Sequence, residues 1–459
     1  MFKNFNIGMQ VHAHDIKFEG ADTVIDNMQK LGRVKTVYLM CNYYKDRHPT
    51  GKGELPHNPL KKAYYTKGGL FFNPHLDFYK KSVLKPQRTP DLDLKDFDAL
   101  KDLTDSAEEK GMRVLAWILS LQDAVLTDKY REYSMVDVYG EKVFGWLCPS
   151  YHEVRRYVES LIKDMVSNYS IDGIFFDRFR FPEWAHFGTA RTEYGKTFDP
   201  VFTCFCKECL RRAKRKGINL SKTRKMIKRL ADSVKGNQIP HLISRYSNYR
   251  KGSLDLVKIF IDMPELSEWM NHRQDIITDF VKEAYSSVKD INPKLEFSLD
   301  LWPPSYSWLL GQNYKKLKKY CDSLKYFAYH KMGGGEDMKA VFQELKNLNP
   351  DLEITPFLDL FYRFFGFSGP NSLDELNERG FTVDFILGET LKALEETKRE
   401  VKVYPGIQIF NVTPEEVKES VDKSFEADID GIIAFCYGWA PLENIKSFGD
   451  SVTQARGSI

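Results

Sequence analysis

The sequence predicts an α/β fold, namely a (β/α)8 TIM barrel with long insertions after its second and fourth strands. Short apolar runs alternate with amphipathic segments along nearly the whole chain, which is typical of βα units repeated around a parallel sheet. With 459 residues, 42% of them hydrophobic, the chain is long enough to bury the core of one elaborated barrel. We therefore expect the barrel to occupy residues 1–450, followed by a C-terminal tail over 451–459.

Nine segments read as buried strands, one more than such a barrel needs. They are residues 6–12, 34–39, 112–118, 173–177, 295–302, 324–330, 353–358, 401–410 and 431–437. Segment 353–358 follows Pro350 and leads into an aromatic stretch, so we expect it to be the surplus strand.

Amphipathic segments between these strands predict the helices. They cover residues 95–110, 152–169, 269–289, 382–399 and 414–427. The last has clear start signals, because Thr413 is placed as N-cap, Pro414 as the first helical residue, and two acidic residues follow in the first turn.

Two connections are longer than ordinary βα loops. Residues 43–93 are rich in Gly, Pro, His, Lys and Tyr, and residues 183–267 contain helical segments and three cysteines. Insertions after barrel strands lie on the face where barrel active sites are found. We expect both insertions to roof that face and to influence specificity.

Charge and hydropathy restrict the partners. Lys and Arg total 67 against 64 Asp and Glu, a net charge of +3, so the molecule has no strong overall field for polyanions. Residues 207–229 are strongly basic, but no aromatic residue follows Phe205 in that run to stack on bases, so we expect a solvated face and no nucleic acid. The start lacks a signal-like apolar region and no window is long enough to span a membrane. We expect a soluble, cytoplasmic chain with no membrane partner, and its oligomeric state stays open.

Seven cysteines, an odd number, argue against a disulfide framework and for a reducing compartment. Four of them, Cys41, Cys148, Cys321 and Cys436, have the contexts of buried free thiols. Cys204, Cys206 and Cys209 are spaced closely enough to share a soft cation, although they supply three ligands and the nearest histidine in sequence is His186. Structural zinc and buried thiols both remain open for this motif, while no catalytic metal and no cofactor are expected.

The apolar run 173–177 ends on Asp177. Catalytic groups of barrels sit at the carboxyl ends of the strands, so Asp177 is the first candidate for a reactive residue. The alternative is that Asp177 caps the next helix or pairs with Arg178 or Arg180.

A second carboxylate ends another expected strand. Asp300 shares its parity with Ser298 and Trp302, which places it on the same face as those residues. Polar or aromatic residues at strand ends are candidates for substrate binding: His12, Trp117, Trp302, Tyr329, His330, Gln408, Tyr437 and Trp439. Two carboxyl groups ringed by aromatic and amide side chains match the needs of sugar hydrolysis. Asp359 is the reserve candidate for the acid.

Arg178 and Arg180 leave the charge of the substrate open. If they reach the pocket, they can clamp a carboxylate or sulfate on a sugar. If they pair with acids of the protein, the substrate is neutral.

The segment Asp172-Gly-Ile-Phe-Phe-Asp-Arg-Phe-Arg-Phe-Pro182 resembles the Asp-Gly-Ile-x-x-Asp-x-x-Arg-Tyr-Pro pattern of glycosyl-hydrolase-like (β/α)8 barrels related to the α-amylase superfamily. The runs 204–209, 404–408 and 431–439 are similar to the same group. The resemblance implies that Asp177 is the nucleophile and that the acid/base follows the fifth or sixth strand, where this chain has Asp300. The chain differs from the pattern in having Asp instead of the more usual Glu there, and Phe181 where Tyr is common.

The sequence therefore predicts a glycoside hydrolase that acts on an oligosaccharide or glycoside with Asp177 and Asp300. Two alternatives remain: a carbohydrate-binding barrel without catalysis, and a metal-dependent barrel hydrolase. Two carboxyl groups separated by roughly 5 to 10 Å would favour the enzyme over the binding protein.

Overall fold

The computed structural model describes residues 5–44, 53–182, 199–247, 258, 261–331 and 337–457. Eight parallel strands form a closed barrel in the order β1-β12-β11-β10-β9-β8-β5-β2, which confirms the predicted (β/α)8 barrel. The barrel strands are β1 (Asn6–Val11), β2 (Thr36–Met40), β5 (Arg113–Leu119), β8 (Gly173–Asp177), β9 (Glu296–Leu301), β10 (Ser323–Phe327), β11 (Lys402–Gln408) and β12 (Gly431–Phe435). Eight of the nine predicted strand segments therefore belong to the barrel.

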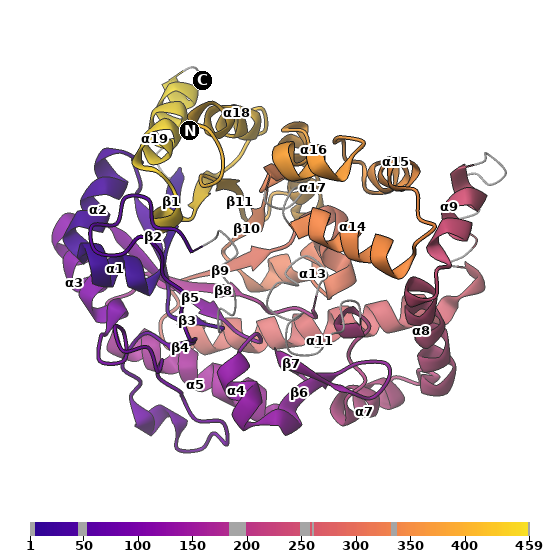
Figure 1. Cartoon of the computed structure of the whole chain (residues 1–459). Coiled ribbons are helices and arrows are strands. Elements are labelled where there is room, and N and C mark those ends of the chain that lie inside the picture. The colour runs from indigo at the N-terminus through magenta and orange to yellow at the C-terminus, as the bar shows by residue number, and fades with distance from the viewer. Residues whose placement is uncertain are drawn as a thin grey trace.

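Helices surround the strands (Figure 1). They are α1 (Ala13–Glu19), α2 (Ala21–Lys30), α3 (Ala99–Lys110), α5 (His152–Asn168), α11 (Pro264–Lys289), α12 (Pro304–Ser307), α13 (Tyr314–Leu317), α17 (Asp384–Thr397), α18 (Pro414–Phe425) and α19 (Leu442–Gly457). The start of α18 is confirmed as predicted, with reciprocal capping between Thr413 and Glu416. Residues 451–457 were expected to form a tail, but they continue α19, whose Val452 is buried.

Polar side chains inside the barrel stack in register. Ser323 donates from its hydroxyl to Ser298 Oγ at 2.8 Å, and the next pair toward the carboxyl ends of the strands is Lys325 with Asp300. Gly406 on the neighbouring strand leaves room for this pair, since a Cβ there would lie 2.4 Å from Lys325 Cε. The prediction that Ser298 and Asp300 share one face of their strand is thus confirmed. This polar face lines the barrel interior.

The long connections contain short elements of their own. Between β2 and α3 lie β3 (Asn42–Tyr43), β4 (Gly69–Leu70) and η1 (Leu76–Tyr79), and between β8 and α11 lie η3 (Asp199–Val201), α7 (Lys207–Arg215), α8 (Leu220–Lys235) and α9 (Ile239–Ser247). A third long connection, between β5 and α5, was not predicted; it holds α4 (Ala124–Lys129), η2 (Arg131–Tyr133) and the hairpin of β6 (Ser134–Val136) and β7 (Lys142–Leu147).

The prediction of a strand over 353–358 was wrong. These residues begin helix α15 (Ile354–Phe365), which lies outside the barrel beside α14 (Asp337–Leu348) and α16 (Leu373–Arg379) (Figure 1). Leu358 and Tyr362, four residues apart, are both buried in this helical cluster, and Pro356 falls in the first turn, where a missing N–H costs no hydrogen bond. Helical periodicity beyond residue 358 was the signal that a short strand reading missed.

Three short 3-10 turns complete the described elements. They are η4 (Trp308–Leu310), η5 (Lys318–Tyr320) and η7 (Tyr437–Trp439). Among the described residues, no helix has both the length and the apolar character needed to cross a membrane.

Candidate active site

Asp177 ends β8 inside the barrel and is 2% exposed. Trp117 Nε1 donates to Asp177 Oδ2 at 3.1 Å, Arg180 Nη1 donates to Asp177 Oδ1 at 3.2 Å, and the backbone N–H of Arg178 also donates to this carboxylate. These nitrogen donors therefore fix the orientation of Asp177. Asp177 lies at the end of the barrel where the strands have their carboxyl ends, here called the mouth.

Arg180 is fully buried, and its guanidinium lies near the rings of Trp302, at 5.5 Å, and Trp146, at 5.9 Å. Arg178 has φ +59, and its guanidinium lies 5.5 Å from the ring centre of Tyr44. The sequence left open whether Arg180 binds the substrate or pairs with a carboxylate of the protein. In the structure Arg180 pairs with Asp177.

Asp300 is the neighbour of Asp177 across the sheet. Strands β8 and β9 are paired in parallel, with Phe176 opposite Leu299, so the next residues on the two strands, Asp177 and Asp300, stand side by side. Neighbouring strands lie about 4.8 Å apart, and both side chains face the barrel interior. The two candidate carboxyl groups are thus brought together at the mouth.

Lys325 was missed by sequence reasoning. It is fully buried on β10, its Nζ lies 3.1 Å from Asp300 Oδ1, and it donates to the Tyr329 hydroxyl at 2.6 Å. The ammonium also lies 4.4 Å from the ring centre of Phe327 and 5.6 Å from that of Phe435. The available signal was a lysine within an otherwise apolar strand, because a charge in such a place needs a partner.

The environment of this pair shifts the pKa values of both Asp300 and Lys325. Burial raises the pKa of Asp300 to about 8, and the nearby Asp177 charge adds to this increase, while Lys325 opposes it. Burial lowers the pKa of Lys325. The raised pKa favours the protonated form of Asp300, which is the form that a general acid needs.

Aromatic side chains line another side of the mouth. The Trp439 ring lies 4.8 Å from His12, 5.2 Å from Phe410 and 5.7 Å from Phe435, between ring centres. Trp439 also lines a hollow of about 350 Å³. The other lining residues are Glu54, Pro56, Lys331, Phe410, Asn411, Val412, Thr413 and Pro441. Trp439 and Phe410 thus belong both to the aromatic group and to the lining of this hollow.

His12, His14 and Asp15 form a group with the residue types of a metal site, and their possible ligand atoms lie within 4.8 Å of one another. Their present contacts are with the protein: His12 Nδ1 lies 3.0 Å from Cys436 Sγ, and Asp15 accepts from the His12 backbone N–H. Burial lowers the pKa of His12 to about 3 and raises that of Asp15 to about 7. His12 is therefore neutral at physiological pH.

Two predicted binding residues, Tyr437 and Gln408, make contacts within the protein. The Tyr437 hydroxyl donates to Glu19 Oε2 at 2.8 Å, which ties η7 to the end of α1, and Gln408 Nε2 donates to the Phe410 carbonyl at 2.8 Å. His330 is buried, and burial lowers its pKa to about 4. These contacts hold the barrel rim together.

Asp359 does not join the mouth. It lies on α15, with its side chain 57% exposed and paired with Arg363 at 2.6 Å. His186, considered as a metal ligand, lies outside the described residues.

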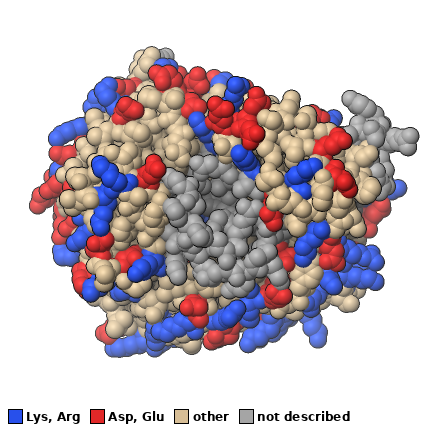
Figure 2. All heavy atoms as spheres, in the orientation of Figure 1, with Lys and Arg blue, Asp and Glu red and all other residues tan. Residues whose placement is uncertain are grey.

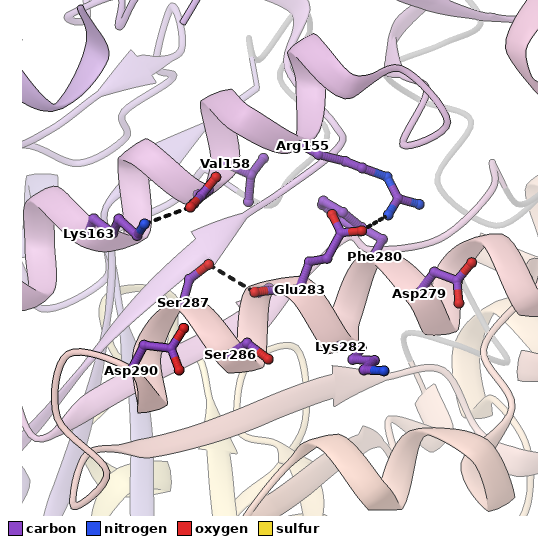
Figure 3. A pocket seen from close by; sticks show the side chains of 12 residues that line it. Arg155, Val158, Lys163, Asp279, Phe280, Lys282, Glu283, Ser286, Ser287 and Asp290 are labelled. Atoms are coloured by element: carbon purple, nitrogen blue, oxygen red, sulfur yellow. Dashed lines mark hydrogen bonds and ion pairs between the residues drawn. The ribbon is translucent and has the colours of Figure 1, made fainter. Parts of the chain in front are cut away.

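A groove of about 490 Å³ lies between α5 and α11 on the outer layer, away from the strand ends (Figure 3). Its wall carries both signs of charge, with Arg155 paired to Glu283 and Lys163 to Glu159. The groove contains none of the residues predicted for the site.

Lys and Arg side chains gather over α7 and α8 at the lower right of the molecular surface (Figure 2). Two members of this basic run, Arg212 and Lys216, pair with Asp279 and Asp275 of α11. Part of the basic run therefore pairs with acidic residues of the protein.

Residues 76–196 match a model of the family Glycosyl hydrolase-like 10. This match includes the Asp172–Pro182 motif and confirms the resemblance to glycosyl-hydrolase-like barrels. No curated protein matches the chain.

Similar folds occur among solved structures. The glycoside hydrolase domain of PgaB (BpsB) from Bordetella bronchiseptica aligns with a TM-score of 0.53 and 12% identity, covering 98% of each chain. A β-galactosidase from Halorubrum lacusprofundi aligns at 0.52 and 12% identity over 98% of this chain and 58% of its own. The catalytic domain of a Paenibacillus polymyxa β-amylase aligns at 0.50 and 9% identity over 98% of this chain and 99% of its own. At these identities the likeness concerns the fold.

Proposed function

We propose that this chain is a glycoside hydrolase that acts on an oligosaccharide or glycoside through Asp177 and Asp300. The observation that carries the proposal is the placement of two buried carboxyl groups side by side at the ends of β8 and β9, in different surroundings. Asp177 accepts from nitrogen donors, whereas the pKa of Asp300 is raised to about 8. Hydrolysis of a glycosidic bond needs this division between a carboxylate and a proton donor.

In the proposed reaction, Asp177 acts on the anomeric carbon, directly or through an activated water. Trp117 and Arg180 hold the carboxylate in one orientation, which reduces the reorganisation needed to reach the transition state. Asp300 gives its proton to the leaving oxygen, and Lys325 is placed to stabilise the carboxylate that remains. The chemistry needs no cofactor.

Arg180 is engaged with the protein, because its guanidinium is buried against Asp177 and two tryptophans. We propose that Arg180 orients Asp177 and that a neutral sugar lies beside this pair. Trp439, beside the 350 Å³ hollow, offers an apolar surface for a sugar face. We therefore propose that the substrate enters along the Trp439 side.

A carbohydrate-binding barrel without turnover is the second candidate. The observation that favours it is that Asp300 and Lys325 are both fully buried and paired with each other, which withdraws the proposed acid from solvent. The two candidates differ in turnover and not in sugar binding.

The test is a screen of aryl glycosides and neutral polysaccharides with the wild type and Asp177→Asn. The hydrolase predicts turnover by the wild type and a loss of several orders of magnitude in the variant, with sugar binding retained. Asp359→Asn is the matched control, because that carboxylate lies exposed on α15. Sugar binding without turnover would support the second candidate, and equal turnover by wild type and Asp177→Asn would contradict the proposed roles.

A further inference from the structure

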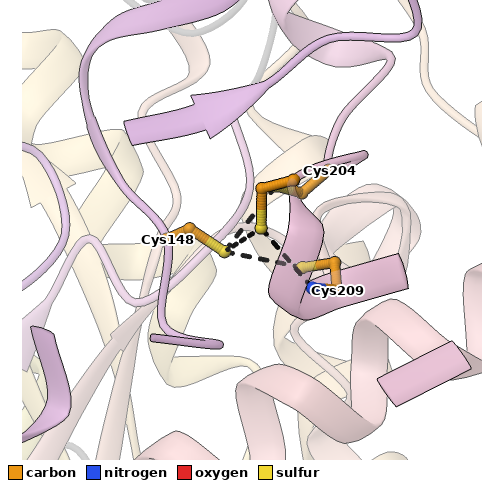
Figure 4. Close-up of side chains that lie close together, drawn as sticks. Cys148, Cys204 and Cys209 are labelled. Carbon is orange, nitrogen blue, oxygen red and sulfur yellow. Dashed lines mark hydrogen bonds between the residues drawn. The ribbon is translucent and has the colours of Figure 1, made fainter. Parts of the chain in front are cut away.

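Four buried cysteines from two separate connections meet in one cluster (Figure 4). Cys148 follows β7, and Cys204, Cys206 and Cys209 lie at and before the start of α7. Cys148 Sγ lies 3.5 Å from the sulfurs of Cys206 and Cys209 and 3.6 Å from that of Cys204. All four sulfurs lie within 4.8 Å of one another. Cys148 thus adds a fourth sulfur to the three of the local sequence motif.

The spacing of the sulfurs fits one tetrahedral ion. Four thiolates bound to zinc at about 2.3 Å stand about 3.8 Å from one another, close to the 3.5–3.6 Å found around Cys148. A disulfide needs two sulfurs at about 2.05 Å and leaves the other two unexplained. Cys206-Lys-Glu-Cys209 also has the two-residue spacing common in structural zinc sites.

The surroundings suit thiolates. Cys206 is the N-cap of α7, and its sulfur accepts from the backbone N–H of Cys209 at 3.5 Å. Ser150 Oγ lies 3.1 Å from Cys209 Sγ. The helix N-terminus and the buried Arg273 both place positive charge near the sulfurs.

We propose that Cys148, Cys204, Cys206 and Cys209 bind one structural zinc ion. Four protein ligands close the coordination sphere, which is the arrangement of structural and not catalytic zinc. The ion joins the β5–α5 connection to the insertion that follows β8, where Phe205 N–H already donates to the Val136 carbonyl at 2.8 Å. Trp146, two residues before Cys148, contacts Arg180, so the site also braces one wall of the mouth.

Metal analysis of the purified full chain tests this proposal by mass spectrometry. We expect one equivalent of zinc in the wild type, retained in Cys321→Ser, and lost in Cys148→Ser and Cys206→Ser. Cys321 is the matched control, because it is also buried but its sulfur contacts Leu317 O outside the cluster. Removal of the zinc should lower the melting temperature of the wild type and expose four additional reactive thiols.

The wild-type measurement does not depend on whether the variants fold. Cobalt exchanged into the wild type should give the intense visible bands of a tetrahedral thiolate complex. A wild type free of zinc, with the four cysteines as thiols or disulfides, would overturn the proposal. So would stoichiometric iron in place of zinc, or zinc retained in folded Cys148→Ser.

Discussion

Lys325 Nζ lies 3.1 Å from Asp300 Oδ1, and both side chains are fully buried inside the barrel. Burying such a carboxyl–lysine pair stabilises the fold only weakly relative to apolar packing, but removing one partner leaves the other buried without compensation. Because burying these two polar groups costs desolvation free energy, their presence at the mouth favours a role in catalysis. Asp177 on the neighbouring strand completes the group.

Replacing Trp117 by Phe should weaken catalysis without unfolding the barrel. The change removes the N–H that donates to Asp177 Oδ2, and a hydrogen bond to a charged group contributes about 1.5–3 kcal/mol. We expect kcat/KM to fall on the order of 10- to 100-fold. Trp308→Phe removes an indole donor on η4, at an exposed position, and should leave kcat/KM unchanged. Equal rates in wild type and Trp117→Phe would contradict a role for Trp117 in holding Asp177.

The pH dependence should report Asp300. Its pKa is raised from 3.8 to about 8 in the folded state, so the proton donor is lost and kcat/KM falls as the pH rises through about 8. The same shift means that protonated Asp300 stabilises the fold fully below its unfolded pKa and that this contribution is lost as the pH passes about 8. Asp15→Asn is the control, because burial also raises the pKa of Asp15. This variant should keep the fall of kcat/KM at high pH, and loss of that fall in Asp15→Asn would contradict its assignment to Asp300.

Lys325→Met should move the alkaline limb of the pH profile, that is, the fall of kcat/KM as the pH rises. The lysine charge lowers the pKa of Asp300, so its removal should shift the limb to higher pH, which a kcat/KM profile measures directly. Lys318→Met is a matched control, since Lys318 pairs with Glu400 outside the barrel. A limb that stays in place in Lys325→Met would mean that another group titrates there.

Gly406→Ala should disturb the Asp300–Lys325 pair. The added Cβ would meet Lys325 Cε at 2.4 Å and Tyr326 O at 2.8 Å, and overpacking of this kind costs about 1–3 kcal/mol. We expect a lower melting temperature and reduced turnover. Gly388→Ala in α17 meets nothing within 4 Å and should be neutral or stabilising. Similar behaviour of the two variants in thermal unfolding would contradict the tight fit around Lys325.

The sequence was sufficient to predict the barrel, because strand and helix periodicities alternate regularly and Asp177 and Asp300 end strands with the right parity. It was not sufficient for Lys325, whose partner lies on another strand and becomes visible only through the β9–β10 register. Cys148 was interpreted as an isolated thiol for the same reason, since the three cysteines it contacts are at least 56 residues away.

Local patterns also gave wrong predictions where a strand and a helix have similar composition. Residues 353–358 are apolar and short, and only the later spacing of Leu358 and Tyr362 distinguishes helix α15 from a strand. Tyr437 ends the predicted strand 431–437, but β12 stops at Phe435, and the Tyr437 hydroxyl contacts Glu19. The direction of a side chain beyond the last strand residue does not follow from parity.

The most direct test of the central claim compares leaving groups in Asp300→Asn, on a sugar that the wild type hydrolyses. If Asp300 is the proton donor beside Asp177, the variant should lose little kcat/KM on a dinitrophenyl glycoside, whose leaving group needs no proton. It should lose several orders of magnitude on the alkyl glycoside of the same sugar. Equal losses on the two substrates by a folded variant would contradict the assignment of Asp300 as the acid.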